Sequence, residues 1–320
     1  MKAIVYTEYG SPDVLQLKDV EKPTPKDDQV LIKIHAASVN AYDWHFLTAD
    51  IFLLRVMGGG LLKPKLTRLG ADVAGRVEAV GRDAHQFQPG DEVFGDMAGH
   101  GNGGFAEYVS APESVFALKP SNLSFEEAAA VPMAAVTALQ GLRDQGQIRP
   151  GQKVLINGAS GGVGTFAVQI AKVLGAEVTA VCSATNAGLV KGLGADHIVN
   201  YREQDFTATN EHYDIIFDAV SSRSFGECKK ALTRHGVYVN TLPTPSIFWH
   251  IGTTTLLPGK KAATMMVSQR AEDVAWICEQ LRTGRLKVVI DKVFPLDQVK
   301  DALAYSRTGR ARGKIVLKVI

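Results

Sequence analysis

The sequence predicts an α/β protein in which a doubly wound parallel sheet of the Rossmann type is joined to a β-barrel-like domain. The chain has 320 residues, and at about 150 residues per domain this length favours two domains. Short runs rich in Val and Ile, separated by Gly and Pro, fill roughly the first 120 residues. From residue 153 onward, apolar runs alternate with helical stretches, which is the pattern of a parallel sheet covered by helices.

The first part of the chain is predicted to be rich in strands. Strands are expected at 3–6, 29–35 and 74–80, and a Pro-Gly turn opens another within 89–94. One more strand is expected at 104–109. Short strands at this spacing are typical of a small barrel.

The second part begins with a helix signal, because Ser124 and Glu127 have the spacing of a capping box. Residues 124–289 are assigned to the Rossmann domain. The terminal strand 314–320 is expected to return to the first domain, which then comprises 1–123 and 290–320. The expected strands of the second part are 153–157, 178–181, 197–199, 214–218 and 237–240, and the expected helices are 164–174, 187–193, 271–283 and 297–305.

Composition and charge exclude several classes of protein. Lys and Arg number 35 and Asp and Glu 33, so the net charge is +2 and no nucleic acid partner is expected. Three Cys residues lie far apart and form no disulfide or zinc-finger pattern, which predicts a reducing, cytoplasmic compartment. No transmembrane segment is expected, because the best candidate, 51–62, is short of the roughly 20 residues required and contains Arg55. The start of the chain shows no signal-peptide pattern.

The strongest functional signal is a glycine-rich turn between the strand 153–157 and the helix that follows it. Glycines let the backbone approach a pyrophosphate, and the helix N-terminus offers N–H groups and a positive dipole end. The alternative is a tight turn without a ligand, but strand, helix and spacing together favour a binding loop. The expected cofactor-binding residues are Gly158, Ala159, Ser160, Gly161, Gly162, Val163 and Gly164.

The end of the next strand indicates which nucleotide binds. An Asp or Glu would bind the ribose 2′-OH of NAD there, whereas this chain continues with Cys182 and Ser183. A 2′-phosphate would meet no carboxylate, Ser183 could donate to it, and Tyr201 and Arg202 follow the neighbouring strand. These residues predict NADPH in preference to NADH. The alternative is that Arg202 is a solvated surface charge and Tyr201 a packing residue.

Several motifs together resemble the medium-chain dehydrogenase/reductase superfamily. They are the glycine turn with its helix, Leu-Gly-Ala-Asp at 193–196, and the segments 89–94, 104–109 and 313–317, so that the resemblance covers essentially the whole chain. It implies a GroES-like β domain that carries both termini, a Rossmann domain, and a homodimer. It also implies cofactor contacts from the backbone of Leu242 and from Lys314.

Zinc-dependent members of this superfamily carry metal ligands that this sequence lacks. Their Cys corresponds to Asn40, their His-Glu pair corresponds to 71–72, and no Cys occurs in 96–104, where their structural zinc lobe should lie. The chain therefore resembles the zinc-free quinone oxidoreductase branch, and no metal is expected. Asn40, Asp43 and Tyr201 match the pattern of that branch.

The resemblance implies NADPH-dependent reduction of quinones or of the activated C=C bond of α,β-unsaturated carbonyl compounds by hydride transfer. Hydride addition to such acceptors places negative charge on oxygen, which a few hydrogen-bond donors can stabilise without a metal. The expected catalytic residues are Asn40, as a donor either to the substrate oxygen or to the nicotinamide-side ribose, Thr137 near the nicotinamide, and Asp43, whose expected role is to order the loop. An NADPH-binding sensor or partner-binding module with little or no turnover stays an alternative.

Three further features of the sequence have more than one interpretation, and a fourth bears on the dimer. Tyr42, Trp44 and His45 either line the substrate pocket or pack within the domain. The segment 51–62 is a lid, a surface that touches lipid, or a packed helix. The segment 243–258 lines the cleft or forms a subunit contact, and the expected edge strand at 262–267 offers a pairing surface for a dimer.

Overall fold

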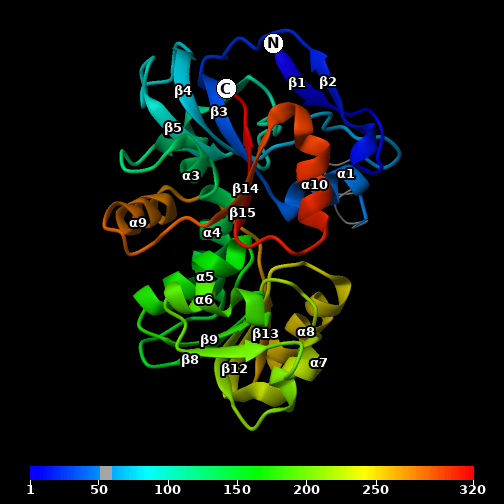
Figure 1. Cartoon of the computed structure of the whole chain (residues 1–320), viewed down its shortest axis with the longest axis vertical. Coiled ribbons are helices and arrows are strands. Elements are labelled where there is room, and N and C mark those ends of the chain that lie inside the picture. The colour runs from blue at the N-terminus through cyan, green and yellow to red at the C-terminus, as the bar shows by residue number, and fades with distance from the viewer. Residues whose placement is uncertain (51–59) are drawn as a thin grey trace. The chain divides into compact units, whose positions relative to one another are not determined.

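The structure is a computed structural model that describes residues 1–50 and 60–320 (Figure 1). Its contacts divide the chain into unit 1, Met1–Met133 with Val288–Ile320, and unit 2, Ala134–Lys287. The boundary expected at 123/124 falls earlier than the observed one, because helix α3 (Phe125–Ala129) packs on the strands of unit 1. The three interpretations of 51–62 depend on 51–59, which lie outside the described residues.

Unit 1 contains a seven-stranded sheet whose main path runs β14-β15-β3-β4-β5-β7, while β6 pairs with β3 and the hairpin β1-β2 stands apart. The terminal strand β15 pairs antiparallel with β3, as expected for a strand that returns to the first domain. The strands are β1 (Lys2–Val5), β2 (Gln16–Asp19), β3 (Gln29–Val39), β4 (Asp72–Val80), β5 (Glu92–Asp96), β6 (Tyr108–Pro112), β7 (Phe116–Leu118), β14 (Ile290–Pro295) and β15 (Lys314–Lys318).

Helices close the core of unit 1. They are α1 (Ala41–Thr48), α3, the start of α4 (Pro132–Gln140) and α10 (Val299–Arg307). The core includes the fully buried Ile32 and Ile34 of β3 together with Leu69 and Leu317. The strand expected at 104–109 begins only at Tyr108, because Phe105 and Glu107 before it hydrogen-bond to residues of several separate segments, Leu69, Ile4, Lys2 and Ile34.

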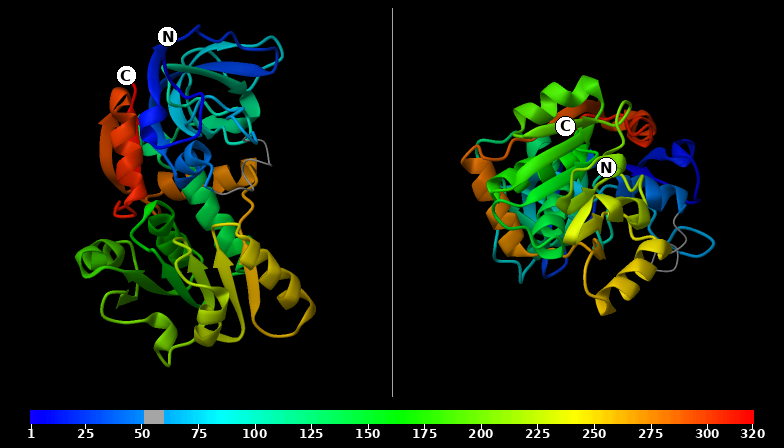
Figure 2. Two further views of the ribbon diagram at one scale, coloured as in Figure 1. Left: turned by 90° about the vertical axis from the view of Figure 1, so that its right-hand side faces the viewer. Right: turned by 90° about the horizontal axis from the view of Figure 1, so that it is seen from below.

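Unit 2 is a six-stranded parallel sheet in the order β10-β9-β8-β11-β12-β13. This order reverses direction between β8 and β11, so both βαβ halves start from the centre of the sheet, as in a Rossmann fold. Helices lie on either side of the sheet (Figure 2). The strands are β8 (Lys153–Asn157), β9 (Glu177–Cys182), β10 (His197–Asn200), β11 (Tyr213–Asp218), β12 (Leu232–Asn240) and β13 (Lys261–Thr264), and the helices are α5 (Gly162–Val173), α6 (Ala187–Gly192), α7 (Phe225–Cys228), α8 (Pro245–Leu256) and α9 (Ala271–Arg282).

The sheet of unit 2 fixes where a ligand site can form. Because all six strands are parallel, the residues that follow β8, β9, β11 and β12 meet at one edge, where open α/β sheets bind ligands. Strand β13 ends the sheet and pairs on one side with β12, so the edge position expected for 262–267 is confirmed for β13.

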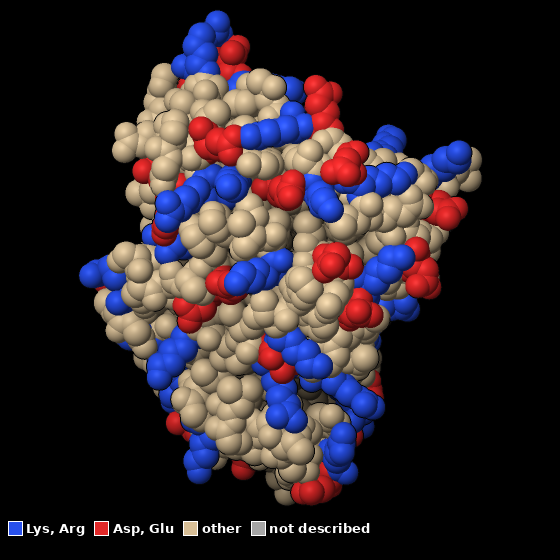
Figure 3. All heavy atoms as spheres, turned by 45° about the horizontal axis from the view of Figure 1, so that its top comes forward, with Lys and Arg blue, Asp and Glu red and all other residues tan. Residues whose placement is uncertain are grey.

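Charged side chains of both signs are interspersed on the face seen in Figure 3. This distribution accords with the net charge of +2. Within 1–50 and 60–320, no helix has both the length and the apolar character needed to cross a membrane.

Candidate active site

A sharp turn joins β8 to α5 at the ligand edge of unit 2. Gly158 has a φ of +78°, in the left-handed region that glycine adopts at little cost. A Cβ atom on Gly164 would lie 2.1 Å from the carbonyl oxygen of Gly158, so only glycine fits where α5 passes the turn. The N–H of Ala159 donates to the carbonyl of Val181 (3.1 Å), which fixes the turn against β9. The turn therefore exposes backbone rather than side chains, as a phosphate-binding loop requires.

The first turn of α5 presents its N–H groups at the same place. Gly161 is the N-cap residue and supplies no side-chain cap, and the N–H of Thr165 donates to the Gly161 carbonyl (2.9 Å). The N–H groups of 162–164 are among those that a helix leaves without an intrahelical partner, at the positive end of its dipole. The Ser160 hydroxyl accepts a hydrogen bond from the Asn186 amide (2.9 Å), which ties the loop to the segment after β9.

The predicted adenosine residues gather at the ends of β9 and β10. Ser183 is buried directly after β9, and its hydroxyl lies 2.8 Å from that of Thr185. The N–H of Tyr201 donates to the carbonyl of Cys182 (3.3 Å), which brings the start of the next loop beside Ser183. The Tyr201 ring and Arg202 are exposed, and no residue of 1–50 or 60–320 forms an ion pair with Arg202. This end of the site offers two hydroxyl groups and an uncommitted guanidinium to an anion.

A buried carboxylate organises the ends of β11 and β12. Asp218 accepts hydrogen bonds from the Asn157 amide (2.9 Å), from the N–H groups of Val220 and Ser221 (3.0 and 2.8 Å) and from the Tyr238 hydroxyl (3.0 Å). Burial, reinforced by Asp218, raises the pKa of Tyr238, so the phenol stays protonated and donates. Sequence reasoning did not single out Asp218, although a polar residue that ends a buried strand at the ligand edge was the available signal.

Asn240, which ends β12, orients the segment that contains Leu242. Its Oδ1 accepts from the N–H of Leu242 (2.7 Å) and from the Ser221 hydroxyl (2.5 Å), and its amide donates to the Tyr238 hydroxyl (3.0 Å). Because the N–H of Leu242 is engaged, its carbonyl oxygen is the backbone group that a carboxamide would meet. A partly open cavity of about 250 Å³ adjoins this segment, with His250 in its wall.

A second polar cluster lies in unit 1, where β3 passes into α1. Asn40 is the N-cap residue of α1, and its N–H donates to Oδ2 of Asp43 (2.8 Å). The other oxygen of Asp43 accepts from the N–H of Gly70 (2.9 Å). Asp43 is completely buried, and burial raises its pKa to about 7. Its two hydrogen bonds join the start of α1 to the segment that precedes β4.

Asp72, the first residue of β4, meets the Asn40 side chain. It accepts hydrogen bonds from the Ser38 hydroxyl, from the Asn40 amide and from the N–H of Met133, each at 3.0 Å. The ammonium group of Lys314, the first residue of β15, donates to Oδ1 of Asn40 and lies 3.6 Å from Asp72. Side-chain contacts therefore join three strands and the start of α4.

Three carboxyl groups and one ammonium group share this buried region. Burial, reinforced by the charge of Asp72, raises the pKa of Asp96 to about 7. Burial also raises the pKa of Asp72 and lowers that of Lys314, and in each case the opposite charge of the partner counteracts the shift. Asp43 and Asp96 consequently hold protons at a pH where exposed carboxyl groups have released them.

The three aromatic residues expected at the substrate pocket all lie on α1. The Tyr42 hydroxyl donates to Oδ1 of Asn102 (3.3 Å), and burial raises the pKa of Tyr42 to about 12. Trp44 packs against the core of unit 1 with its ring 3.7 Å from that of His45, and His45 Nδ1 lies 2.9 Å from Asp50. Trp44 therefore packs on the core of unit 1 and Tyr42 reaches a polar partner in the loop before β6, while a pocket role for the three residues stays a prediction.

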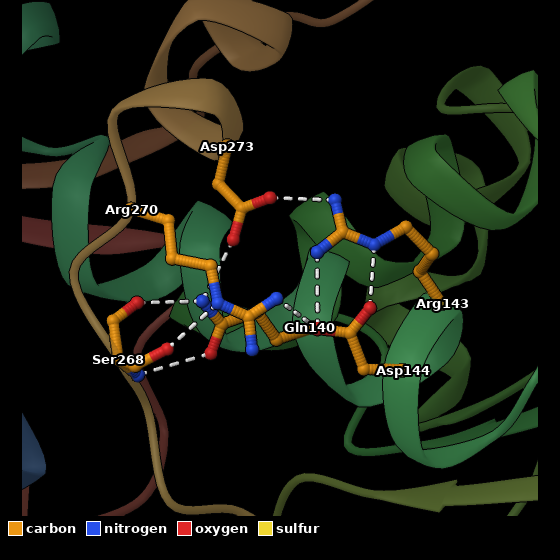
Figure 4. Close-up of polar contacts among 6 residues, drawn as sticks. All are labelled: Gln140, Arg143, Asp144, Ser268, Arg270 and Asp273. Carbon is orange, nitrogen blue, oxygen red and sulfur yellow. Dashed lines mark hydrogen bonds and ion pairs between the residues drawn. The ribbon is translucent and has the colours of Figure 1, made fainter.

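Thr137 is buried on α4, and the end of this helix is held by a network that sequence reasoning missed (Figure 4). Gln140 donates to the Ser268 carbonyl (2.6 Å) and to Asp273 (2.7 Å). Arg143 donates to the buried Asp273 (2.5 Å), and its guanidinium also pairs with Asp144. These contacts fix the segment between β13 and α9 against the end of α4.

Comparison with known proteins identifies the family. The alcohol dehydrogenase GroES-like domain matches residues 26–121, and the zinc-binding dehydrogenase domain matches residues 193–317. A 2-methylene-furan-3-one reductase of Solanum lycopersicum is 38% identical over 100% of this chain and 79% of its own length. An NADPH-dependent alkenal/one oxidoreductase of Arabidopsis thaliana is 33% identical over 99% of this chain and 79% of its own length. The solved quinone oxidoreductase of Coxiella burnetii superposes with a TM-score of 0.89 at 32% identity, covering 100% of this chain and 99% of that one.

The chain belongs to the quinone oxidoreductase-like branch of the medium-chain dehydrogenase/reductase superfamily. The expected two-domain architecture, with a GroES-like domain and a Rossmann domain, is confirmed. The chain is an oxidoreductase that uses a nicotinamide cofactor, as its relatives do.

The name of one matching family raises the question of zinc, and the residues in place do not fit that metal. Zinc sites use thiolate, imidazole and carboxylate ligands. At the corresponding positions this oxidoreductase has the Asn40 amide, Ala71 and Asp72. The ammonium group of Lys314 donates to Asn40 and lies 3.6 Å from Asp72, so a cation already contacts both side chains. Across the described ranges, no group of three or more His, Cys, Asp or Glu residues is arranged to hold a metal ion.

The residues of unit 2 do fit a nicotinamide dinucleotide. At the N-cap of the twelve-residue helix α5, Gly161 has no side chain, and even an added Cβ atom would meet no atom closer than the Gly158 oxygen at 3.4 Å, so the helix N-terminus is open. Backbone N–H groups at such a place bind phosphate oxygens.

Proposed function

We propose that this protein is an NADPH-dependent, zinc-independent oxidoreductase that reduces quinones or the activated C=C bond of α,β-unsaturated carbonyl compounds. The observation that carries the proposal is the buried contact of Lys314 with Asn40 and Asp72, which supplies hydrogen-bond donors and a positive charge without a metal. The activities for which three relatives are named support the same substrate classes: one is a quinone oxidoreductase, and two are reductases of conjugated carbonyl compounds.

Residues of unit 2 would hold the cofactor. The backbone of 158–164 would bind the pyrophosphate, and the carbonyl oxygen of Leu242 would accept a hydrogen bond from the nicotinamide carboxamide. Ser183, Tyr201 and Arg202 would surround the adenosine, and the absence of a carboxylate at the end of β9 supports NADPH over NADH. When bound, NADPH supplies the hydride.

Residues of unit 1 would act on the substrate. Hydride addition to the β carbon of an enone, or to a quinone, develops negative charge on the carbonyl oxygen, and water can then supply the proton. The Asn40 amide keeps one N–H that neither Lys314 nor Asp72 uses, and we assign this group as the donor to that oxygen. A donor aimed at developing charge typically contributes about 3–4 kcal/mol to the transition state. Asp43 would hold the Asn40 backbone in place, and Tyr42, Trp44 and His45 would line the substrate pocket. Thr137, which belongs to unit 2, would lie near the nicotinamide.

This donor set favours conjugated acceptors over simple ketones. In an enone or a quinone the developing charge is spread over a conjugated system, whereas reduction of a saturated ketone concentrates it on one oxygen. A single amide N–H is a weaker electrophile than a metal ion, so we expect poor turnover of saturated ketones.

We also propose a homodimer and a cytoplasmic location. Strand β13 ends its sheet, and Trp249, Leu256 and Met266 in the same unit are 65% to 87% exposed, which supports a second copy of the chain as the partner. Light scattering of the purified protein should give twice the mass of one chain, and Trp249→Glu should shift the measured mass toward that of the monomer.

The three free thiols support a reducing compartment, which cell fractionation would test.

The test of function is NADPH oxidation by metal-stripped protein with an alkyl enone, a 2-alkenal, a quinone and a saturated ketone, with NADH in parallel. Turnover of at least one conjugated acceptor, with little on the saturated ketone, would support the proposal. Tight NADPH binding without turnover of any acceptor would refute it and would favour a binding module. Activity that returned only on adding zinc would refute the metal-free assignment.

A further inference from the structure

Lys314 is a lysine in an unusual environment, because its side chain is only 3% exposed within the sheet of unit 1. Lysine is almost never fully buried unless it is paired, since removal of an ammonium group from water costs several kcal/mol. Its partners are Oδ1 of Asn40, to which it donates, and Asp72 at 3.6 Å. The chain thus places a deeply buried ammonium group on the residue assigned as the donor to substrate.

The chemistry of these partners fixes the Asn40 amide in one orientation. An ammonium group can only donate and a carboxylate can only accept, so Oδ1 must face Lys314 and Nδ2 must face Asp72. The reverse orientation would set two donors against each other on one side and two acceptors on the other. The backbone N–H of Asn40 is separately held by Asp43. One N–H of the side chain remains, and its direction is set by the other contacts.

We propose that Lys314 and Asp72 are positioning residues, which orient the Asn40 amide and polarise its remaining N–H toward the substrate oxygen. A positive charge on the amide oxygen draws electron density from the nitrogen and strengthens the N–H as a donor, as in other chains of hydrogen bonds at low dielectric. The inference rests on the proposed function. It differs from a cofactor contact of Lys314, because it acts on the chemical step and leaves NADPH affinity unchanged.

The geometry also allows a purely structural role, since the same contacts join β3, β4 and β15. A structural pair would affect stability and all kinetic parameters together. A positioning pair would lower kcat through Asn40 alone, so its effect would vanish when Asn40 is already absent. A double-mutant cycle separates the two.

The test compares wild type, Lys314→Met, Asn40→Ala and the double variant, with Lys318→Met as the control because Lys318 lies exposed on the same strand. We measure kcat and KM for an enone or quinone, the Kd of NADPH by fluorescence, and the Tm. Lys314→Met should lower kcat about 10- to 100-fold with NADPH affinity within twofold, and it should have less than a threefold effect in the Asn40→Ala background. Lys318→Met should behave as wild type.

Other outcomes would overturn the inference. A loss of kcat that is equally large in the Asn40→Ala background, or a Kd of NADPH that rises as much as kcat falls, would show that Lys314 does not act through Asn40. If Lys314→Met does not fold, Lys314→Arg and the pH profile of wild type decide the question. Arg should restore much of kcat, and kcat should fall on the alkaline side as the ammonium group loses its proton. An inactive wild type would refute the proposed function instead.

Discussion

Gly164→Ala is the substitution that the phosphate loop should tolerate least. The added Cβ would lie 2.1 Å from the carbonyl oxygen of Gly158 and 2.8 Å from the Cα of Ala159. Both neighbours are backbone atoms, so the start of α5 or the turn must move by about 1 Å to restore an ordinary contact. Overpacking of this kind costs roughly 1–3 kcal/mol of stability. The shift also displaces N–H groups that would bind the pyrophosphate. The loss of one hydrogen bond to a charged group costs about 1.5–3 kcal/mol of binding free energy, which lowers the affinity for NADPH about 10- to 100-fold.

The assay is NADPH titration by fluorescence together with thermal unfolding of the apoprotein, and two glycines provide controls. At Gly161 the added Cβ would lie 3.4 Å from the Gly158 carbonyl, an ordinary contact, so Gly161→Ala should leave apoprotein stability nearly unchanged. At Gly188 no atom lies within 4 Å, so Gly188→Ala in α6 should preserve NADPH affinity and gain up to about 1 kcal/mol of stability. Wild-type NADPH affinity in Gly164→Ala would refute the assignment of this turn as the pyrophosphate site.

Three further predictions concern the cofactor, pH and stability. Ser183→Asp should weaken the binding of NADPH at least tenfold and favour the binding of NADH, because a carboxylate would meet the 2′-phosphate. Equal loss of affinity for both cofactors in paired titrations would contradict this. Asp96 has its folded-state pKa raised from 3.8 to about 7, so it disfavours the folded state increasingly as pH rises through this window. In denaturant unfolding, the free energy of unfolding of Asp96→Asn should therefore rise relative to wild type by up to about 4 kcal/mol between pH 4 and pH 8. A difference between the two proteins that stays constant with pH would exclude the titration of Asp96 as its cause. Asp273→Ala should lower the free energy of unfolding by about 3 kcal/mol, because it removes the buried carboxylate to which Arg143 and Gln140 both donate. An unchanged midpoint of unfolding would show that the network in Figure 4 is dispensable for stability.

Local signals explain what the sequence predicted well. The strand 153–157 matches β8 because a run of four buried apolar and amide residues needs cover on both faces, and the Gly positions that follow require the turn seen at Gly158 and Gly164. The capping box of Ser124 and Glu127 is present at the start of α3. Each of these features depends on residues that lie close together in the chain.

Features that depend on distant residues were not predictable in the same way. The partners Asn40 and Lys314 are 274 positions apart, and only the pairing of β15 with β3 brings them together. Helix α8 was also missed, because three consecutive Thr residues and little amphipathic pattern conceal it. The Thr-Pro pair at its start, with Thr244 as the N-cap, was the signal available for it.

The most direct test of the central claim follows the hydride itself. The metal-stripped protein is given an alkyl enone and NADPH that carries two deuterium atoms at C4 of the nicotinamide, and the product is examined by NMR and mass spectrometry. The account predicts one deuterium at the β carbon of the saturated ketone. When the solvent alone is deuterated, it predicts no deuterium at the β carbon, because the solvent labels only the α carbon. Product with solvent deuterium at the β carbon, or no product until zinc is added, would contradict it.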